Sequence, residues 1–337
     1  MFDIKSFYEA SSVQDAVNAL KDDPDAEVIS GGTDVLIRVR EGKDAGRSLV
    51  SIHNLKELKG VKELENGDLW IGAGTAFSHI TNDSLIKRRL NMLGEAVDQV
   101  GGPQIRNTGT IGGNVCNGAT SADSAASLWA LNAELVLEGP DGERTVNIKD
   151  FYTGPGRTVR DRCEVLKYLL IRRENIDGWQ GRYLKYGKRN AMEIATLGCA
   201  VRVKLSEDKQ KLEDVRLAYG VAGPTPLRCY DAEDALRGKD VSDDTIFETF
   251  GKLALTQVNP RSSWRASKEF RLQLIEELAK RGLYQALLLA GGIPDASCAK
   301  RYSGTWKQET GAAHAEDGAC SAEKKEQAQE AGGKEYA

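Results

Sequence analysis

Two glycine-rich segments carry residue types that bind a phosphorylated ligand through the main chain. Residues 101–124 read GGPQIRNTGTIGGNVCNGATSADS, with six glycines and two charged side chains. Residues 30–34 read SGGTD and stand between two short apolar runs. Glycine costs about 0.5–1 kcal/mol relative to alanine inside a regular element, so clustered glycines indicate a close approach to the backbone. Together the two segments predict a site that holds the two phosphates of a dinucleotide from both sides.

The predicted phosphate contacts are backbone N–H groups, assisted by hydroxyl and amide side chains. Without Cβ atoms, oxygens can approach the backbone, and successive N–H groups or a following helix start favour negative charge. Taken alone, each segment could equally be a tight turn without a ligand or a phosphate-binding turn. The presence of both segments favours phosphate binding. Neither is a Rossmann fingerprint, because no GxGxxG opens a helix in a β-α-β unit. We assign to this site Ser30, Gly31, Gly32, Thr33, Asp34, Thr110, Ile111, Gly112, Gly113 and Asn114.

Two charged residues extend the predicted site beyond the phosphates. Asp123 precedes a helical segment, where its carboxylate either caps the helix or accepts hydrogen bonds from ribose or ribityl hydroxyls. Lys185 stands near a strand end, close to the cluster Lys188-Arg189. These cations either neutralise a phosphate or an electron-rich ring of a cofactor, or they are solvated surface charges. Spacing alone leaves the alternatives open for both sites.

Cysteine spacing and charge exclude several other kinds of site. The six cysteines are never closer than 22 residues, so the chain lacks zinc-ribbon and ferredoxin-type spacing. Its three histidines are not paired at helical spacing, and we assign neither a metal ligand nor a catalytic side chain. The net charge is −4, and four lysines face seven acids in the last 35 residues, so the body is nearly neutral and nucleic acid is not the expected partner. Chemistry here therefore needs an organic cofactor or another polypeptide.

The chain shows no signal for secretion or for a membrane span. The first ten residues, MFDIKSFYEA, lack both the basic and the apolar parts of a secretory signal. No stretch approaches 18 consecutive apolar residues. We therefore expect a cytoplasmic protein without a membrane partner.

The elements that must position the two glycine segments change character along the chain. Residues 1–60 alternate short helices with β-rich runs, and residues 60–170 are rich in strands. Asn66-Gly67 and Asp141-Gly142 predict hairpins with two-residue type I′ turns, which need positive φ at both central residues. The glycine-rich loop 101–124 is expected between two helical segments of this second region.

A third region begins near residue 172. Three β-rich runs at 182–186, 200–205 and 215–219 predict an antiparallel sheet, and apolar periodicity predicts helices over 245–257 and 268–289. After residue 292 the composition falls to alanine, glycine, glutamate, lysine and glutamine. Such a segment buries too little surface to offset its ordering entropy, so we expect a disordered tail over 293–337.

Four longer strings resemble one flavoprotein family. The strings are SGGTDVLI, GPQIRNTGTIGGNVCNGATSADS, YLKYGKRNAMEIATLGCA and PRSSWRASKEFRLQLI. They resemble the FAD-binding subunits of the molybdenum hydroxylases, and within that family most of all the separate FAD-binding subunits of bacterial xanthine dehydrogenases. The resemblance runs from residue 1 to about residue 292, and the TIGGN string with its flanks is specific to the family.

The resemblance implies an α+β fold in two domains. Residues 1–172 would form a two-subdomain FAD-binding domain of the vanillyl-alcohol-oxidase/PCMH type. Residues 173–292 would form a smaller C-terminal α+β domain, an antiparallel sheet plus helices. The string at 261–271 would belong to that second domain, near the flavin end of the cofactor.

The resemblance also implies the cofactor and its contacts. FAD would be bound non-covalently, with its pyrophosphate held by the SGGTD and TIGGN segments. Asp123 would accept sugar hydroxyls, Lys185 would lie near the flavin, and Glu193 would occupy the acidic position of the same string.

In relatives of this kind the flavoprotein works in a three-part assembly. A molybdopterin-binding subunit oxidises the substrate, a 2Fe–2S subunit relays electrons, and the flavin passes them to an acceptor. The resemblance thus implies an FAD-dependent oxidoreductase subunit of a xanthine dehydrogenase-like complex, with NAD as acceptor and activity on purine only in the complex.

Three alternatives accompany this interpretation. The same subunit role could serve nicotinate, another purine, an aldehyde or an aromatic acyl thioester, because the molybdenum polypeptide sets the substrate. A self-sufficient flavin oxidase or reductase would need its own acid or base beside the flavin, and the cofactor segments contain no histidine. A flavin-free structural homologue is disfavoured by the two intact glycine motifs.

Overall fold

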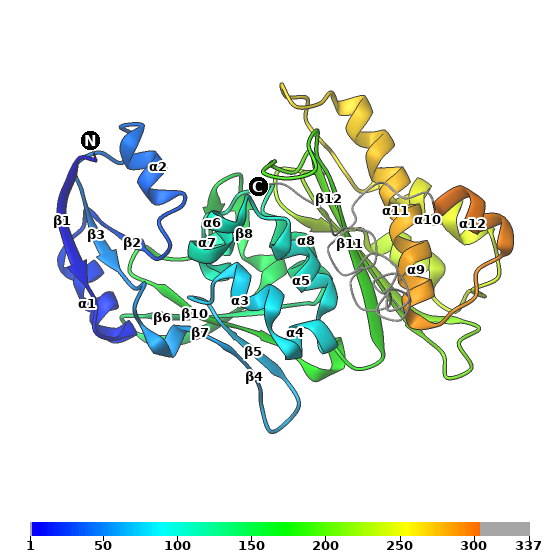
Figure 1. Ribbon diagram of the computed structural model, residues 1–337, viewed down its shortest axis with the longest axis horizontal. Helices are drawn as coiled ribbons and strands as arrows, with labels where there is room; N and C mark the ends of the chain where they lie inside the picture. Colours follow the sequence, from blue (N-terminus) through cyan, green and yellow to red (C-terminus); the bar gives the residue numbers. More distant parts are fainter. Residues whose placement is uncertain (1, 304–337) are drawn as a thin grey trace, which may run out of the picture. The chain divides into compact units, whose positions relative to one another are not determined.

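The computed structural model describes residues 2–303, and its first sheet carries the SGGTD turn (Figure 1). This sheet is parallel, with strand order β1-β3-β2. Helix α1 begins after Ser12, whose hydroxyl accepts a hydrogen bond from the Asp15 N–H, and buries one apolar face against the sheet. The SGGTD turn joins β2 to α2. The elements are β1 (Ile4–Glu9), α1 (Val13–Asp22), β2 (Ala26–Ile29), α2 (Val35–Arg40), β3 (Arg47–Ser51) and the 3-10 turn η1 (Lys56–Leu58).

The second sheet is antiparallel, with strand order β4-β5-β10-β6-β7. Its strands alternate in direction, and their buried residues form one large core with the helices that follow β5. A two-stranded β8–β9 hairpin lies between β7 and β10 along the chain. The strands are β4 (Val61–Glu63), β5 (Leu69–Gly72), β6 (Glu134–Gly139), β7 (Gly142–Asn147), β8 (Tyr152–Gly154), β9 (Arg157–Thr158) and β10 (Val165–Ile171).

Six short helices connect β5 to β6. The last of them, α8, has every residue buried and packs on α5. The 3-10 turns η2 (Ile148–Asp150) and η3 (Arg173–Asn175) follow later in the chain. The helices are α3 (Phe77–Asn82), α4 (Ser84–Arg89), α5 (Asn91–Asp98), α6 (Pro103–Thr108), α7 (Ile111–Cys116) and α8 (Asp123–Ala130).

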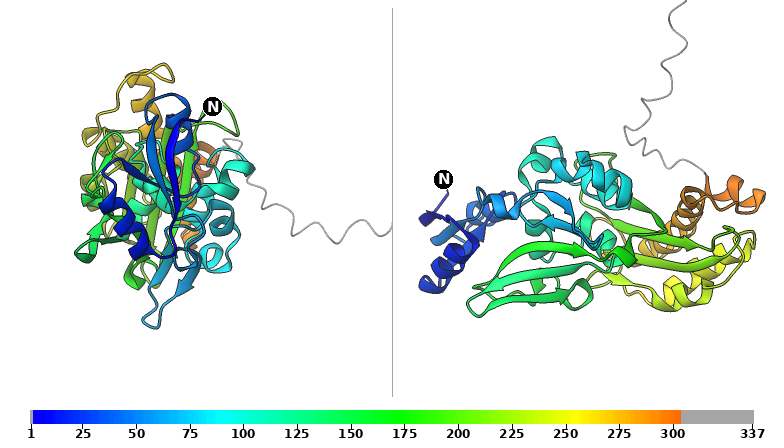
Figure 2. Two further views of the ribbon diagram at one scale, coloured as in Figure 1. Left: turned by 90° about the vertical axis from the view of Figure 1, so that its left-hand side faces the viewer. Right: turned by 90° about the horizontal axis from the view of Figure 1, so that it is seen from below.

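The third sheet is antiparallel, with strand order β11-β12-β13-β14, and has helices on both faces (Figures 1 and 2). Helix α11 packs on β11 and β12, and α10 packs on α11, whereas α5 and α8 of the preceding region also contact this sheet. These elements are β11 (Trp179–Tyr186), β12 (Leu197–Leu205), β13 (Leu212–Gly220), β14 (Leu227–Arg228), α9 (Tyr230–Leu236), α10 (Thr245–Thr256), α11 (Lys268–Ala290) and α12 (Ala296–Tyr302).

Two arginines, Arg216 and Arg182, join this third sheet to the helices before it. The Arg216 guanidinium lies 4.2 Å from the centre of the Trp179 ring and donates to the carbonyl oxygen of Ala130 in α8. Arg182 of β11 forms an ion pair with Glu95 of α5. These bonds cross between the two regions, so they fix the position of β11, the strand that carries Lys185.

Both predicted hairpins form, but the predicted type I′ turns are wrong. The first connects Glu63 to Leu69 through five residues, with positive φ at Gly67. The second has Pro140 and Asp141 at its centre, and neither has positive φ. Proline holds φ near −65°, which excludes the first central position of a type I′ turn.

The structure corrects two further expectations. The glycine-rich segment 101–124 is not one loop, because α6 and α7 form within it. The predicted disordered tail begins too early, because residues 296–302 form α12. The Tyr302 ring stacks on Phe247 at 4.9 Å between ring centres, and this buried contact orders the helix. The rest of the predicted tail, from residue 304, lies outside the described residues. Within residues 2–303, no helix has the length and apolar character needed to cross a membrane.

Candidate functional site

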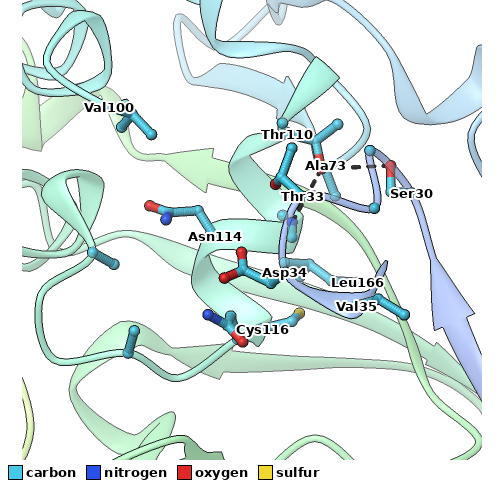
Figure 3. A pocket seen from close by; sticks show the side chains of 18 of the residues that line it. Ser30, Thr33, Asp34, Val35, Ala73, Val100, Thr110, Asn114, Cys116 and Leu166 are labelled. Carbon is cyan, nitrogen blue, oxygen red and sulfur yellow. Dashed lines mark hydrogen bonds between the residues drawn. The ribbon is translucent and has the colours of Figure 1, made fainter. Parts of the chain in front are cut away.

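A cavity of about 960 Å³ lies where the first sheet, the α6–α7 segment and the β9–β10 region meet (Figure 3). This volume is at the upper end of the range for small-molecule and cofactor pockets, about 300–1,000 Å³. Its wall brings together segments from residue 27 to residue 194. Of the twelve residues assigned from the sequence, the cavity wall includes Ser30, Gly31, Gly32, Thr33, Asp34, Thr110, Gly112, Gly113, Asn114 and Asp123.

The SGGTD turn, which lines this cavity, has a row of unpaired backbone donors. Within the described part of the chain, no group accepts a hydrogen bond from the backbone N–H groups of residues 31–35. Gly32 has φ +71°, a left-handed conformation that bends the turn and that glycine adopts readily. Gly31 is required for a different reason, because a Cβ there would lie 2.0 Å from the Thr108 carbonyl oxygen. Consecutive N–H groups in such a turn form an anion-binding concavity.

The TIGGN segment reaches the same cavity, but the backbone N–H groups of residues 111–114 are already used. The N–H groups of Ile111 and Gly112 donate to the carbonyl oxygens of Thr75 and Ala73, at 3.1 and 2.8 Å. Gly113 donates to the Thr110 hydroxyl at 3.2 Å, and Asn114 donates to the Thr110 carbonyl oxygen at 3.0 Å. The predicted second row of free N–H groups is therefore wrong. Residues just after β5 accept the first two of these hydrogen bonds, and Thr110 accepts the other two.

Glycine at position 112 serves this packing. A Cβ there would lie 2.5 Å from the Ala73 Cβ and 2.7 Å from its carbonyl oxygen. A larger residue would push α7 away from β5 instead of filling the cavity. Ile111 is fully buried in the core and does not line the cavity. The segment contributes two polar side chains, Thr110 and Asn114.

These two side chains are held in place by neighbouring residues. The Thr110 hydroxyl caps α7 and also donates to the Ser30 hydroxyl at 3.5 Å, which links the two glycine segments (Figure 3). The Asn114 side-chain oxygen accepts a hydrogen bond from Ser124 at 2.7 Å. This bond directs the amide of Asn114 and leaves its Nδ2 group without a partner among the described residues.

Replacing Thr110 by valine should weaken the junction between the two glycine segments. Valine has a similar volume but removes the cap of α7, a change that costs about 1 kcal/mol of stability. We expect a lower unfolding midpoint in urea and weaker retention of a bound cofactor, whereas Thr110→Ser should preserve both. Equal cofactor retention in the valine and wild-type proteins would contradict a role for this hydroxyl in the site.

Asp123 and Lys185 form a buried ion pair at the edge of the cavity. Their side chains are 7% and 6% exposed, and Lys185 Nζ lies 2.8 Å from Asp123 Oδ2. Tyr183 donates to the other carboxylate oxygen, and Lys185 also donates to the Gln99 carbonyl oxygen, both at 2.8 Å. Burial raises the pKa of the Asp123 carboxyl, and the Lys185 ammonium opposes that rise. Asp123 is not the N-cap of α8, because Ala122 occupies that position. Lys185 is not a solvated surface charge, because its side chain is buried against Asp123.

The other cations near Lys185 are placed elsewhere. Arg189 forms an ion pair with Glu193 at 2.9 Å, and Glu193 lines the cavity. Lys188 lies over the ring of Trp264, outside the cavity wall. Among residues 2–303, no cluster of histidine, cysteine and acidic side chains is arranged to hold a metal ion.

Several cavity residues were not identified from the sequence. Arg38 lies one helical turn after Asp34, and its guanidinium pairs with Glu27 and Asp44 and reaches Asn117 at 3.4 Å. Its position in the helix after the SGGTD turn was the signal that could have indicated it. Further lining residues are ordinary residue types from distant segments that no local pattern marks, among them Val100, Ile105, Arg157, Arg160, Leu166, Met192 and Ile194.

Comparison with known proteins defines the family. Residues 2–171 match the family described as FAD binding domain in molybdopterin dehydrogenase, and residues 182–286 match the CO dehydrogenase flavoprotein C-terminal domain. The chain belongs to the family of FAD-binding subunits of molybdenum hydroxylase-type complexes, as the sequence predicted.

Within this family the chain is similar to a particular flavoprotein subunit. It is 43% identical over 292 residues to the xanthine dehydrogenase FAD-binding subunit of Escherichia coli O157:H7, which covers 87% of this chain and 99% of that protein. It is also 31% identical to the nicotinate dehydrogenase FAD-subunit of Eubacterium barkeri, over 72% of this chain and 83% of the relative.

Solved structures confirm the predicted fold class. The carbon monoxide dehydrogenase of Hydrogenophaga pseudoflava, in a form that lacks the Mo-pyranopterin moiety of its cofactor, has a chain that superposes with a TM-score of 0.80. The two chains are 28% identical, and the match covers 86% of this chain and 99% of the other. The fold is thus an FAD-binding domain followed by a C-terminal domain of mixed helix and antiparallel sheet.

Proposed function

We propose that this chain is the FAD-holding electron-transfer subunit of a xanthine dehydrogenase-like molybdenum hydroxylase. A 2Fe–2S subunit would be its electron donor, a molybdopterin-binding subunit would oxidise the purine, and NAD in the cytoplasm would be the acceptor. The observation that carries the proposal is the row of free N–H groups at residues 31–35, which opens into a cavity of cofactor size. The 43% identity to a xanthine dehydrogenase FAD-binding subunit supports the choice of complex.

The SGGTD turn would hold the FAD pyrophosphate from one side. The N–H groups of residues 31–35 supply the donors, and the Thr33 hydroxyl lines the same wall. Thr110 and Asn114 would approach from the other glycine segment with side-chain donors only. Gly112 and Gly113 would act by close packing, Ile111 would act from the core, and Arg38 would add positive charge nearby.

The flavin end of the cofactor would lie beside Asp123. The carbonyl oxygen of Gln99 accepts a hydrogen bond from Lys185, and the next residue, Val100, lines the cavity. Gly102 lies beside the Met192 side chain, which also lines the cavity. Apolar side chains therefore cluster at this end, where a flat ring system would exclude water. The Asp123 carboxylate would accept a hydrogen bond from a sugar hydroxyl, and Lys185 would hold that carboxylate in place. FAD itself supplies the redox chemistry when bound.

We retain the proposed domain limits, an FAD-binding domain over residues 1–172 and a C-terminal domain over 173–292. The two family matches, at 2–171 and 182–286, support this division. Substrates other than a purine remain alternatives, since nicotinate dehydrogenase is named among the relatives. No observation favours a self-sufficient oxidase, because the described residues that line the cavity include no histidine.

The chain should bind one FAD without a covalent bond. Among residues 2–303, Cys116 is the only cysteine that lines the cavity, and burial raises the pKa of its thiol to about 11, so the reactive thiolate is scarce at neutral pH. Acid precipitation of the purified protein should release yellow FAD into the supernatant. Colour that stays with the pellet, or a supernatant with FMN alone, would contradict this expectation.

The isolated chain should reduce an artificial electron acceptor with NADH but should not oxidise xanthine. Among the described residues, no group of histidine, cysteine and acidic side chains could hold a metal ion, and the proposed site provides for a flavin and a nicotinamide partner. Adding the molybdenum and 2Fe–2S subunits should give xanthine-dependent reduction of NAD. Purine oxidation by the chain alone would favour the self-sufficient flavoenzyme. If NADH does not bleach the flavin, NAD is not the electron acceptor of this subunit.

A further inference from the structure

Two distant segments meet on the surface beside the apolar end of the cavity. One is the turn between β11 and β12, residues 187–196, and the other is the irregular segment 259–267 before α11 (Figure 1). Arg271 is buried and binds both, because its guanidinium donates to the Thr196 carbonyl oxygen, the Arg261 carbonyl oxygen and the Ser263 hydroxyl. The two segments therefore form one continuous surface, not two independent loops.

This surface exposes large apolar side chains. Trp264 is 76% exposed, Met192 is 65% exposed and Ile194 is 50% exposed. Tryptophan, methionine and arginine are enriched at the centres of protein interfaces, and contiguous exposed apolar groups mark interaction sites. We call Lys188, Met192, Ile194, Arg261 and Trp264 the Trp264 surface.

The Trp264 surface is positively charged in a chain whose net charge is −4. The two segments, 187–196 and 259–267, contain four lysine and arginine residues and one carboxylate, Glu193. Glu193 pairs with Arg189, which leaves Lys188, Arg261 and Arg265 without a carboxylate partner in these segments. Lys188 and Arg265 lie over the Trp264 ring, at 5.7 and 4.3 Å from its centre. A complementary partner must therefore be acidic and must present an apolar group to the tryptophan.

The shape of the surface favours a macromolecule over a small nucleotide. Met192 and Ile194 line the cavity, whereas Trp264, Lys188 and Arg261 do not. The cations and the tryptophan thus flank the cavity from outside. Small ligands are bound in concave pockets that enclose most of their surface, and these exposed side chains provide no such enclosure.

We propose that the Trp264 surface is the docking site for the acidic face of the 2Fe–2S polypeptide, an assignment that rests on the proposed function. Docking here would bring the one-electron donor to the apolar end of the cavity, where the flavin ring would lie. Met192 and Ile194 line the cavity and remain largely exposed, so a docked partner would contact the rim of the cavity there. The charges would steer the partner, and Trp264 would fill an apolar pocket on it.

The test uses the full chain loaded with FAD and the purified 2Fe–2S polypeptide encoded with it. Lys188→Glu/Arg261→Glu reverses two exposed charges whose side chains form no hydrogen bond within the described residues. Lys59→Glu/Lys239→Glu makes the same change in net charge at two other exposed lysines. Trp264→Ala removes the exposed ring alone. Affinity is measured by titration at low and at moderate salt, and flavin content and NADH-dependent dye reduction are measured for each protein.

The first double variant should raise the Kd for the 2Fe–2S polypeptide at least about tenfold at low salt and should reduce its salt dependence. Trp264→Ala should raise the Kd at both salt concentrations. The control should stay within twofold, and all proteins should keep full flavin and dye activity. Equal affinity in all variants would overturn the docking site while leaving the proposed function intact. Loss of flavin in the first variant would assign the surface to the cofactor and overturn the inference. Absence of wild-type binding would overturn both.

Discussion

Replacing Gly31 by alanine should abolish flavin retention. The new Cβ would lie 2.0 Å from the Thr108 carbonyl oxygen and 2.6 Å from its carbon, both backbone atoms that a rotamer change cannot move. The SGGTD turn would have to shift by about 1 Å, and such overpacking costs about 1–3 kcal/mol. The N–H groups of residues 31–35 would shift with it, and the protein would also lose the stabilisation that a bound ligand gives to the native state.

Two quantities are measured for each protein. One is the flavin-to-protein ratio after gel filtration, and the other is the thermal midpoint of unfolding with and without added FAD. Gly102→Ala is the matched control, because its Cβ would meet the nearest atom, Met192 Cγ, at an ordinary 3.4 Å. The control should retain flavin and should be stabilised by FAD as the wild type is. Full flavin in Gly31→Ala would show that the pyrophosphate is not held by this turn.

Breaking the ion pair between Asp123 and Lys185 should cost about 3–5 kcal/mol of stability even without flavin, because either single change leaves a buried charge uncompensated. In Lys185→Met, the Asp123 carboxylate would retain only the Tyr183 hydroxyl. In Asp123→Asn, the Lys185 ammonium would retain the Gln99 carbonyl oxygen. The double variant Asp123→Asn/Lys185→Met removes both charges, so its cost should be smaller than the sum of the single costs.

The pH dependence identifies the charge responsible. Burial already raises the Asp123 pKa, and removing the ammonium raises it further. A raised carboxyl pKa means that the folded state binds the proton more tightly than the unfolded state. The stability of Lys185→Met should therefore fall as the pH rises above the unfolded value near 4, and should recover as the pH is lowered. Urea unfolding at several pH values measures this slope. A slope that persists in the double variant, which lacks the carboxylate, would exclude Asp123 as its source.

The family and the first glycine turn were predictable because both are local properties of the sequence. SGGTD lies directly after a strand, and a turn at that point needs no distant partner to expose its N–H groups. The TIGGN string looked equivalent by composition. Two of its donors, the N–H groups of Ile111 and Gly112, are satisfied by Thr75 and Ala73, which lie more than 30 residues earlier, and no local pattern indicates such a pairing.

The partners of the charged residues were likewise not predictable from local sequence. Asp123 and Lys185 were both identified, but the alternatives for each stayed open until β11 was placed against α8. Lys188 stood beside Lys185 in the same string, yet the turn after β11 directs it to Trp264 and away from the cavity. The sign of each charge was known from the sequence, but its partner was not.

Residue types and short spacings were enough to predict the family, the α+β class and the segments of the candidate cofactor site. They did not indicate which backbone donors are free, which charges are paired and which distant side chains complete the cavity, because these depend on the folded arrangement of the chain. The folded arrangement also brought Trp264 beside Lys188. In each case a group could bind several partners far apart in the chain. The packing of β5, α7, α8 and β11 determines which of them it contacts.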